Sequence, residues 1–251
     1  MSKVTAIVLA AGQGNRMNAK VAKQFLMLGG KPVLFYALKA FEDSSVDEIV
    51  IVAGKGQTEY CRENIVDCYQ IKKVSRIVEG GEERFDSVQR GIMAAESADY
   101  VLIHDGARPF ISKHLIENVI EQVKIVKACI VGVPVKDTIK VIDEDGIIVT
   151  TPDRNTLWAA QTPQCFEYPS IRKAYRMFLE NRSITGASAT DDAMIYETYL
   201  KLPVKMLKGD YNNIKLTTPE DLLLADEILK KYCLKKIKKS NNSFENENKT
   251  T

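Results

Sequence analysis

Short apolar runs alternate with segments of helical periodicity through the first half of the chain. The apolar runs are rich in Val and Ile, as is typical of strands buried on both faces, and lie at 4–9, 48–53, 74–78, 100–104 and 129–133. The segments between them repeat apolar residues at helical spacing, at 32–41, 58–69, 84–95 and 113–126. This alternation predicts an α/β fold with a mostly parallel sheet covered by helices. Ligands of such sheets bind beyond the carboxyl ends of the strands.

One segment departs from this alternation. Residues 137–151 read DTIKVIDEDGIIVTT, two β-prone arms around Asp145-Gly146, which predicts a β-hairpin. A hairpin alone is marginally stable in water and needs a packing partner. The sequence leaves two partners open: the edge of the same sheet, or a second subunit reached by a protruding arm.

The second half predicts helices at 168–180 and 191–199 and a short strand at 204–207. The last helix is expected to start at Thr218-Pro219-Glu220-Asp221, where a capping hydroxyl precedes Pro and two acids, and to end near residue 232. The polar remainder at 233–251 is predicted to be disordered. The sequence therefore predicts one domain over 1–232.

Charge and cysteine usage narrow the function classes. Residues 234–251 carry five Lys and two Glu, which leaves 30 basic and 31 acidic residues in the rest of the chain and argues against a nucleic-acid partner. Five scattered cysteines without a CxxC pair indicate reduced thiols in the cytoplasm. The N-terminus is not typical of a signal peptide, and no apolar run approaches the ~20 residues of a membrane helix.

A glycine loop follows the first predicted strand. It reads Ala10-Ala11-Gly12-Gln13-Gly14-Asn15-Arg16-Met17, and glycines there allow backbone N–H groups to approach phosphate oxygens. A dinucleotide fingerprint needs a small residue where Met17 stands, and a Walker loop needs a Gly-Lys-Ser/Thr that is absent. Arg16 and Lys23 supply two cations beside this loop, as phosphoryl-group transfer requires.

Two further strand ends carry candidate chemistry. Gly80-Gly81 follows the third strand, with Ser87 as a side-chain partner for a base or ribose. The fourth strand ends in HDGARPF at 104–110, where Asp105 and Arg108 suit a metal–triphosphate or an anionic acceptor. We interpret His104 as a structural residue, because attack of one phosphate on another requires no proton to be removed.

Taken together, the motifs resemble the 2-C-methyl-D-erythritol 4-phosphate cytidylyltransferase family of non-mevalonate isoprenoid synthesis. The segments that carry the resemblance are LAAGQGNRM (9–17), AKQFL (22–26), GGEERFDSVQRG (80–91), HDGARPF (104–110), PVKDTIK (134–140), DRNTLWAAQTPQ (153–164), ATDDA (189–193) and NIKLTTPEDL (213–222). They span residues 4–232 in order. The resemblance implies a Rossmann-like, three-layer nucleotidyltransferase fold and a homodimer whose β-arm reaches across the two-fold axis.

The resemblance also implies roles for individual residues. It assigns cytidine recognition to Ala10, Ala11, Gly81, Glu82 and Ser87; triphosphate and transition-state charge to Gly12, Gly14, Arg16, Lys23 and Lys215; and the acceptor site to Asp105, Arg108, Thr138, Arg154, Thr162 and Thr190. Thr138 and Arg154 would come from the neighbouring arm. Glu82 stands where the family often has Asp.

The implied reaction is attack of the acceptor's 4-phosphate oxygen on the α-phosphorus of CTP, with pyrophosphate leaving. Arg16 and Lys23 would neutralise the five-coordinate α-phosphate, and Lys215 would bridge nucleotide and acceptor. The implied cofactor is Mg²⁺, held mainly by triphosphate oxygens and water, with Asp105 as a candidate direct ligand.

Three alternatives stay open from the sequence. The sister activity, ribitol 5-phosphate cytidylyltransferase, shares the fold and the cations, although those enzymes often carry Val where Ala107 stands. A nucleotide-binding regulatory module without turnover is disfavoured by the joint presence of Arg16, Lys23 and Lys215. A general sugar-nucleotide transferase usually extends further after the nucleotide domain.

Overall fold

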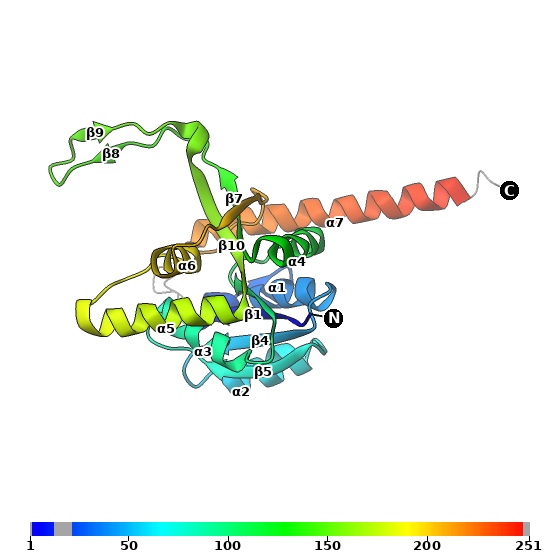
Figure 1. Cartoon of the computed structure of the whole chain (residues 1–251). Coiled ribbons are helices and arrows are strands. Elements are labelled where there is room, and N and C mark those ends of the chain that lie inside the picture. Colours follow the sequence, from blue (N-terminus) through cyan, green and yellow to red (C-terminus); the bar gives the residue numbers. More distant parts are fainter. Residues whose placement is uncertain (1, 13–21, 248–251) are drawn as a thin grey trace.

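The computed structural model describes residues 2–12 and 22–247 and contains a seven-stranded, mostly parallel sheet (Figure 1). The strand order is β11-β7-β10-β6-β1-β4-β5, and only β10 runs antiparallel to its neighbours. The bounds are β1 Val4–Ala10, β4 Glu48–Ala53, β5 Val74–Glu79, β6 Tyr100–Asp105, β7 Ala128–Pro134, β10 Trp158–Glu167 and β11 Lys205–Lys208. The predicted α/β class with a mostly parallel sheet is confirmed.

Helices cover both faces of this sheet. One face packs against α1 (Val33–Glu42), α2 (Thr58–Cys61) with the π-helical turn η3 (Arg62–Asp67), and α4 (Lys113–Val126); the other packs against α3 (Arg84–Ala94), α5 (Tyr168–Thr185) and α6 (Asp192–Leu200). Alternate residues of β1 serve the two layers: Ala6 and Val8 face the first, and Ile7 faces the second. The continuous apolar strands of the sequence are therefore explained by burial on both sides.

Strand β10 is absent from the sequence-based prediction. It inserts between β6 and β7 in the middle of the sheet, although it contains Pro163 and several polar residues. Its register shifts between Ala160 and Gln164, and the Thr162–Pro163 peptide bond in that interval is cis. Proline has no N–H group to donate to a strand ladder, and Pro163 is tolerated in β10 because the ladder is interrupted at that point. A short hairpin of β2 (Met27–Leu28) and β3 (Lys31–Pro32) was also not predicted.

The hairpin at 137–151 is an arm and not an edge strand. Its strands β8 (Val141–Ile142) and β9 (Ile148–Thr150) pair only with each other and form a separate two-stranded sheet. Figure 1 shows the arm projecting from the ends of β7 and β10, away from the helical layers. The 3-10 turn η4 (Arg154–Thr156) leads back from the arm into β10.

The arm exposes apolar side chains along its length. They are Ile139, Val141, Ile142, Ile147, Ile148, Val149 and, at its base, Trp158, between 38% and 64% exposed. Contiguous apolar surface of this kind on an extended element is typical of an interaction site.

The C-terminal helix corrects another prediction. Helix α7 starts at Pro219 as expected, with the Asp221 carboxylate accepting from the backbone of Thr217 and Thr218 at 2.7 and 2.9 Å. It continues to Glu247, however, so the predicted helix end near residue 232 is wrong. Residues 233–247 contain no Gly or Pro to stop the helix, and Lys and Glu favour it.

Cys61, Cys68, Cys129 and Cys165 are free thiols, as the sequence analysis expects. Among the described residues, no helix combines the length and the apolar character needed to span a bilayer.

Candidate functional site

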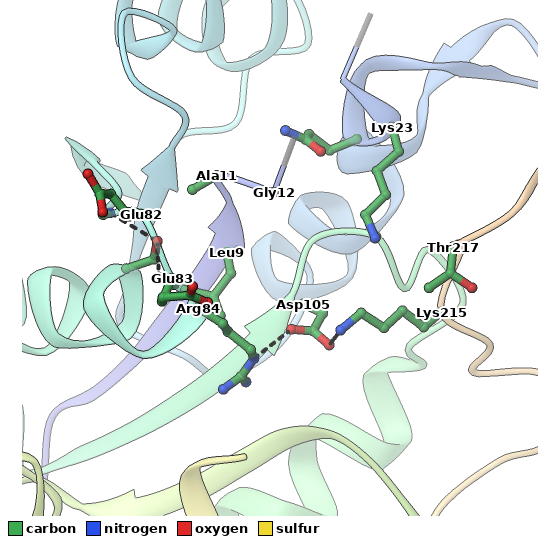
Figure 2. Close-up of a pocket in the computed structure, with 14 residues that line it drawn as sticks. Leu9, Ala11, Gly12, Lys23, Glu82, Glu83, Arg84, Asp105, Lys215 and Thr217 are labelled. Atoms are coloured by element: carbon green, nitrogen blue, oxygen red, sulfur yellow. Dashed lines mark hydrogen bonds and ion pairs between the residues drawn. The ribbon is translucent and has the colours of Figure 1, made fainter. Parts of the chain in front are cut away.

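A cavity of about 490 Å³ lies at the carboxyl ends of the central strands (Figure 2). Five segments line it: the end of β1, the turn around Lys23, the start of α3 with the loop before it, the end of β6, and the loop before α7. The lining residues are Leu9, Ala11, Gly12, Lys23, Gln24, Gly81, Glu82, Glu83, Arg84, Ser87, Asp105, Ala107, Lys215 and Thr217. This is the position at which an open α/β sheet binds its ligands.

The end of β1 carries the first part of the site. The carbonyl of Ala10 accepts a hydrogen bond from the buried amide of Gln24 at 2.5 Å, which fastens the 3-10 turn η2 (Lys23–Phe25) beside the strand. Figure 2 shows the Lys23 side chain extending from that turn toward Asp105 and Lys215. Ala10, Ala11, Gly12 and Lys23 are thus brought together as predicted, while Gly14 and Arg16 lie outside the described residues.

The double glycine after β5 packs directly against the β1 end. A Cβ atom on Gly80 would lie 2.4 Å from that of Ala11, and one on Gly81 would lie 2.2 Å from that of Asp86. Only residues without side chains allow this approach. The Gly81 N–H donates to the Ser87 hydroxyl at 3.1 Å, so Ser87 also shapes the loop that carries Glu82.

Asp105 stands at the centre of a cationic group. Its carboxylate lies 2.9 Å from Lys215 Nζ, 3.4 Å from Arg84 Nε and 3.8 Å from Arg108 Nε. Burial raises the pKa of Asp105, but the positive charges of Arg84, Lys215 and Arg108 outweigh it, so the pKa lies well below its usual range. Asp105 is therefore ionised at every physiological pH, and it holds Lys215 at the cavity wall.

Arg84 is a site residue that the sequence analysis did not assign. Its guanidinium makes two 2.8 Å hydrogen bonds to the fully buried carboxylate of Asp192, which also accepts from the Tyr175 hydroxyl. Burial lowers the pKa of Arg84, and the charges of Asp192 and Asp105 raise it well above its usual value. Arg84 is the first residue of α3, where the positive end of the helix dipole disfavours a cation. This unfavourable placement is the sequence signal that could have identified Arg84 as a site residue.

Thr162 and His104 support Asp105 from the interior. The Thr162 hydroxyl accepts from the Asp105 N–H at 3.0 Å and lies 3.1 Å from His104 Nδ1. Because that hydroxyl then donates to Nδ1, His104 Nε2 carries the proton and donates to the Arg108 carbonyl at 3.2 Å. Burial lowers the pKa of His104 to about 4, so the ring is neutral and structural, as interpreted from the sequence.

The other predicted acceptor residues lie outside the cavity lining. Arg108 is near Asp105, but its Nη1 donates to the Asn213 carbonyl at 2.7 Å. Thr190 is exposed just before α6, and Thr162 is buried in β10. Thr138 and Arg154 are exposed at the base of the arm, where Arg154 donates to the Lys136 carbonyl at 3.0 Å. The structure thus separates these two residues from the cavity of their own chain.

The donor set does not form a protein-held metal site. Within residues 2–12 and 22–247, no three His, Cys, Asp or Glu side chains gather in a metal-binding group. Asp105, whose carboxylate is buried at the cavity, is already paired with three cations. The described residues therefore argue against Asp105 as a direct metal ligand.

A family model described as "IspD: 2-C-methyl-D-erythritol 4-phosphate cytidylyltransferase" matches residues 4–231. The chain is 51% identical to a protein of that name from Lachnoclostridium phytofermentans, over 92% of this chain and 98% of that protein. It is 47% identical to another from Caldanaerobacter subterraneus subsp. tengcongensis, over 91% and 99%.

Solved structures agree with the sequence relatives. The crystal structure of 4-diphosphocytidyl-2C-methyl-D-erythritol synthase from Anaerococcus prevotii superposes with a TM-score of 0.80 at 33% identity, covering 91% of this chain and 96% of that chain. The 2-C-methyl-D-erythritol 4-phosphate cytidylyltransferase from Thermus thermophilus gives a TM-score of 0.71 at 29% identity, with 89% and 98% covered.

Proposed function

This chain belongs to the 2-C-methyl-D-erythritol 4-phosphate cytidylyltransferase family, and we propose that the cavity at the ends of β1 and β6 is its active site. The enzyme transfers CMP from CTP to 2-C-methyl-D-erythritol 4-phosphate. It releases pyrophosphate and yields 4-diphosphocytidyl-2-C-methyl-D-erythritol for isoprenoid synthesis. The observation that carries the location is the entry of Lys23 and Lys215 into one glycine-lined cavity.

The nucleotide half of the site is built from backbone. Ala11 and Gly81 line the cavity and present main-chain groups to the cytosine and ribose, with Ala10 directly behind them in β1, and Glu82 adds a carboxylate to the lining. Close packing of Gly80 on Ala11 supports this role, since rigid main-chain groups discriminate well between bases. Gly12 and Gly14 cradle the triphosphate.

The catalytic half of the site stabilises charge. As the acceptor's phosphate oxygen approaches the α-phosphorus, negative charge collects on the five-coordinate group, and Arg16 and Lys23 neutralise it. Lys215, oriented by Asp105 at 2.9 Å, bridges this charge and the acceptor phosphate. Arg108 and Thr190 shape the acceptor side, and Thr162 supports it from the interior through its hydrogen bond with the Asp105 N–H. The attacking oxygen carries no proton at neutral pH, so a neutral, buried His104 is compatible with this reaction.

We assign a divalent metal, Mg²⁺, to the triphosphate. The four charges of CTP and those of the acceptor exceed what Arg16, Lys23 and Lys215 neutralise. Chelation with EDTA should therefore lower turnover at least about tenfold, and Mg²⁺ in excess should restore it. Pyrophosphate release measures both states. Full turnover in EDTA would contradict a metal-bound substrate.

The chain forms a single nucleotidyltransferase domain over 1–232, and its arm supports a homodimer with shared active sites. In this dimer, residues 137–151 of each subunit pack on the neighbouring subunit. The arm's exposed Ile and Val side chains provide the contact surface. Thr138 and Arg154, exposed at its base, then reach the partner's acceptor site. The free thiols support a cytoplasmic location.

A product assay tests the function. Wild-type protein with CTP, Mg²⁺ and 2-C-methyl-D-erythritol 4-phosphate should form the diphosphocytidyl product, identified by mass. Ribitol 5-phosphate serves as the competing acceptor and UTP as the competing nucleotide. Each is expected to give a kcat/KM at least about tenfold lower, because a site built to hydrogen-bond one substrate leaves polar groups unpaired when a different substrate binds. Equal use of UTP would remove cytosine recognition, and preference for ribitol 5-phosphate would assign the sister activity.

A further inference from the structure

Asn213 lies at the junction of the catalytic cavity and the central strand β10. It sits in the loop between β11 and α7, two residues before Lys215, and none of its surface is exposed. Neither Asn213 nor the residues that its side chain contacts line the cavity. A fully buried polar side chain in a loop needs a reason, because its desolvation has to be offset by hydrogen bonds.

The Asn213 amide contacts the strand that supports Asp105. Nδ2 donates to the Thr162 carbonyl at 2.9 Å and lies 3.4 Å from Gln161 Oε1. The amide of Gln161 is itself fixed, since its Nε2 donates to the Asp210 carbonyl at 2.9 Å. Gln161 therefore presents an oxygen toward Asn213, and both neighbours of Nδ2 are acceptors.

The backbone on either side of Lys215 is bound to the Asp105 loop. The Asn213 carbonyl accepts from Arg108 Nη1 at 2.7 Å, and the Leu216 N–H donates to the Ala107 carbonyl at 2.9 Å. Lys215 lies between these two contacts, and its Nζ lies 2.9 Å from Asp105. The position of Lys215 is thus set by hydrogen bonds on both sides, of which Asn213 makes one.

Packing alone does not account for this asparagine. Its Oδ1 is buried and has no hydrogen-bond partner, so the side chain carries an unsatisfied acceptor that an apolar residue of similar size would not have. What an apolar residue would lack is the donor that ties the loop to Thr162.

We propose that Asn213 is a positioning residue of the acceptor half of the site. Its amide anchors the loop to Thr162, and its carbonyl fixes the Arg108 guanidinium, so that Lys215, Arg108 and Asp105 keep one geometry. This rests on the proposed function, because Lys215 is assigned there to the acceptor phosphate and Arg108 to the acceptor side. Asn213 itself touches neither substrate.

The test compares Asn213→Ala and Asn213→Asp with Asn212→Ala. Asn212 is the exposed neighbour of Asn213 in the same loop, so Asn212→Ala is a control that matches the residue type and the location. Asn213→Asp keeps the shape but replaces the donor by an oxygen facing two acceptors. For both Asn213 variants we expect the KM for the acceptor to rise about tenfold and kcat to fall about tenfold, the scale of a small misplacement of reacting groups. The dissociation constant for CTP should stay within about twofold of wild type, since the nucleotide half is built elsewhere.

The outcomes separate cleanly. Asn212→Ala should match wild type in both KM values and in kcat. If a folded Asn213 variant, checked by circular dichroism and CTP binding, keeps its acceptor KM and kcat within about twofold, the proposal is overturned. An equal loss of CTP and acceptor affinity, or failure of both variants to bind CTP at all, would make Asn213 a residue of general stability and also overturn it. A wild-type enzyme that forms no product would refute the proposed function instead.

Discussion

Replacement of Lys215 by methionine should lower kcat by about 10²–10³-fold while leaving the fold intact. The side chain is partly exposed to the cavity, and its ammonium is the charge closest to Asp105. Methionine keeps most of the aliphatic stem, so the loss is that of one preorganised positive charge in the transition state. Asp105 retains Arg84 and Arg108 as partners and stays ionised.

The measurement is steady-state release of pyrophosphate at saturating CTP and acceptor. Lys208→Met is the matched control, because Lys208 is an exposed lysine on β11 outside the cavity. A Lys215→Met enzyme that keeps more than about half of the wild-type kcat would remove Lys215 from the catalytic group.

Mixing two inactive variants should restore about a quarter of wild-type activity if the arms exchange residues across a dimer. The variants are Lys215→Met, which damages a chain's own site, and Arg154→Met, which damages the neighbour's. Each homodimer carries one lesion in every site and should be nearly inactive. In a heterodimer, one site collects both lesions and the other collects none.

Joint unfolding and refolding should give about half heterodimers, and hence the expected quarter of activity. The control mixture combines Lys215→Met with Lys23→Met, two lesions that both damage their own chain's site. That mixture leaves one lesion in every site and should recover nothing. Recovery in neither mixture, with the heterodimers of the Lys215→Met and Arg154→Met mixture verified by mass, would place Arg154 in its own chain's site and contradict the shared-site dimer.

The parallel part of the sheet could be predicted because its strands are buried on both faces. In β4 every fully buried position is apolar, and in β1 Thr5 is the one exception, so the pattern of Val and Ile is sufficient. Strand β10 lacks that pattern because its buried positions include the polar residues Gln161, Thr162 and Gln164. Their side chains form hydrogen bonds with the backbone of the loop after β11, the end of β6 and the start of α6. A sequence pattern cannot distinguish such a strand from a polar loop.

The site could be predicted as far as it is made of strand ends. Gly81, Lys23 and Asp105 each follow a buried strand or its loop, and the sheet brings strand ends together. Arg84 was not assigned because its function depends on two carboxylates, Asp105 and Asp192, that lie 87 residues apart in the chain. Thr162 was expected to face the acceptor, whereas its hydroxyl is committed to Asp105 and His104, a pairing that only the packed sheet reveals.

The departure and return of the arm have a consequence for how related sequences vary in length. It leaves from β7 and re-enters as β10, and these strands pair antiparallel up to the arm, with Val133 opposite Ala159. If the two hairpin strands gain or lose the same number of residues, the pairing of β7 with β10 is therefore unchanged. An unequal change would shift the register of these two strands. We expect evolutionary insertions and deletions to occur in pairs around the turn at Gly146, which has a positive φ of 79°. The loop from 209 to 217, bound at both ends to the catalytic group, should keep one length.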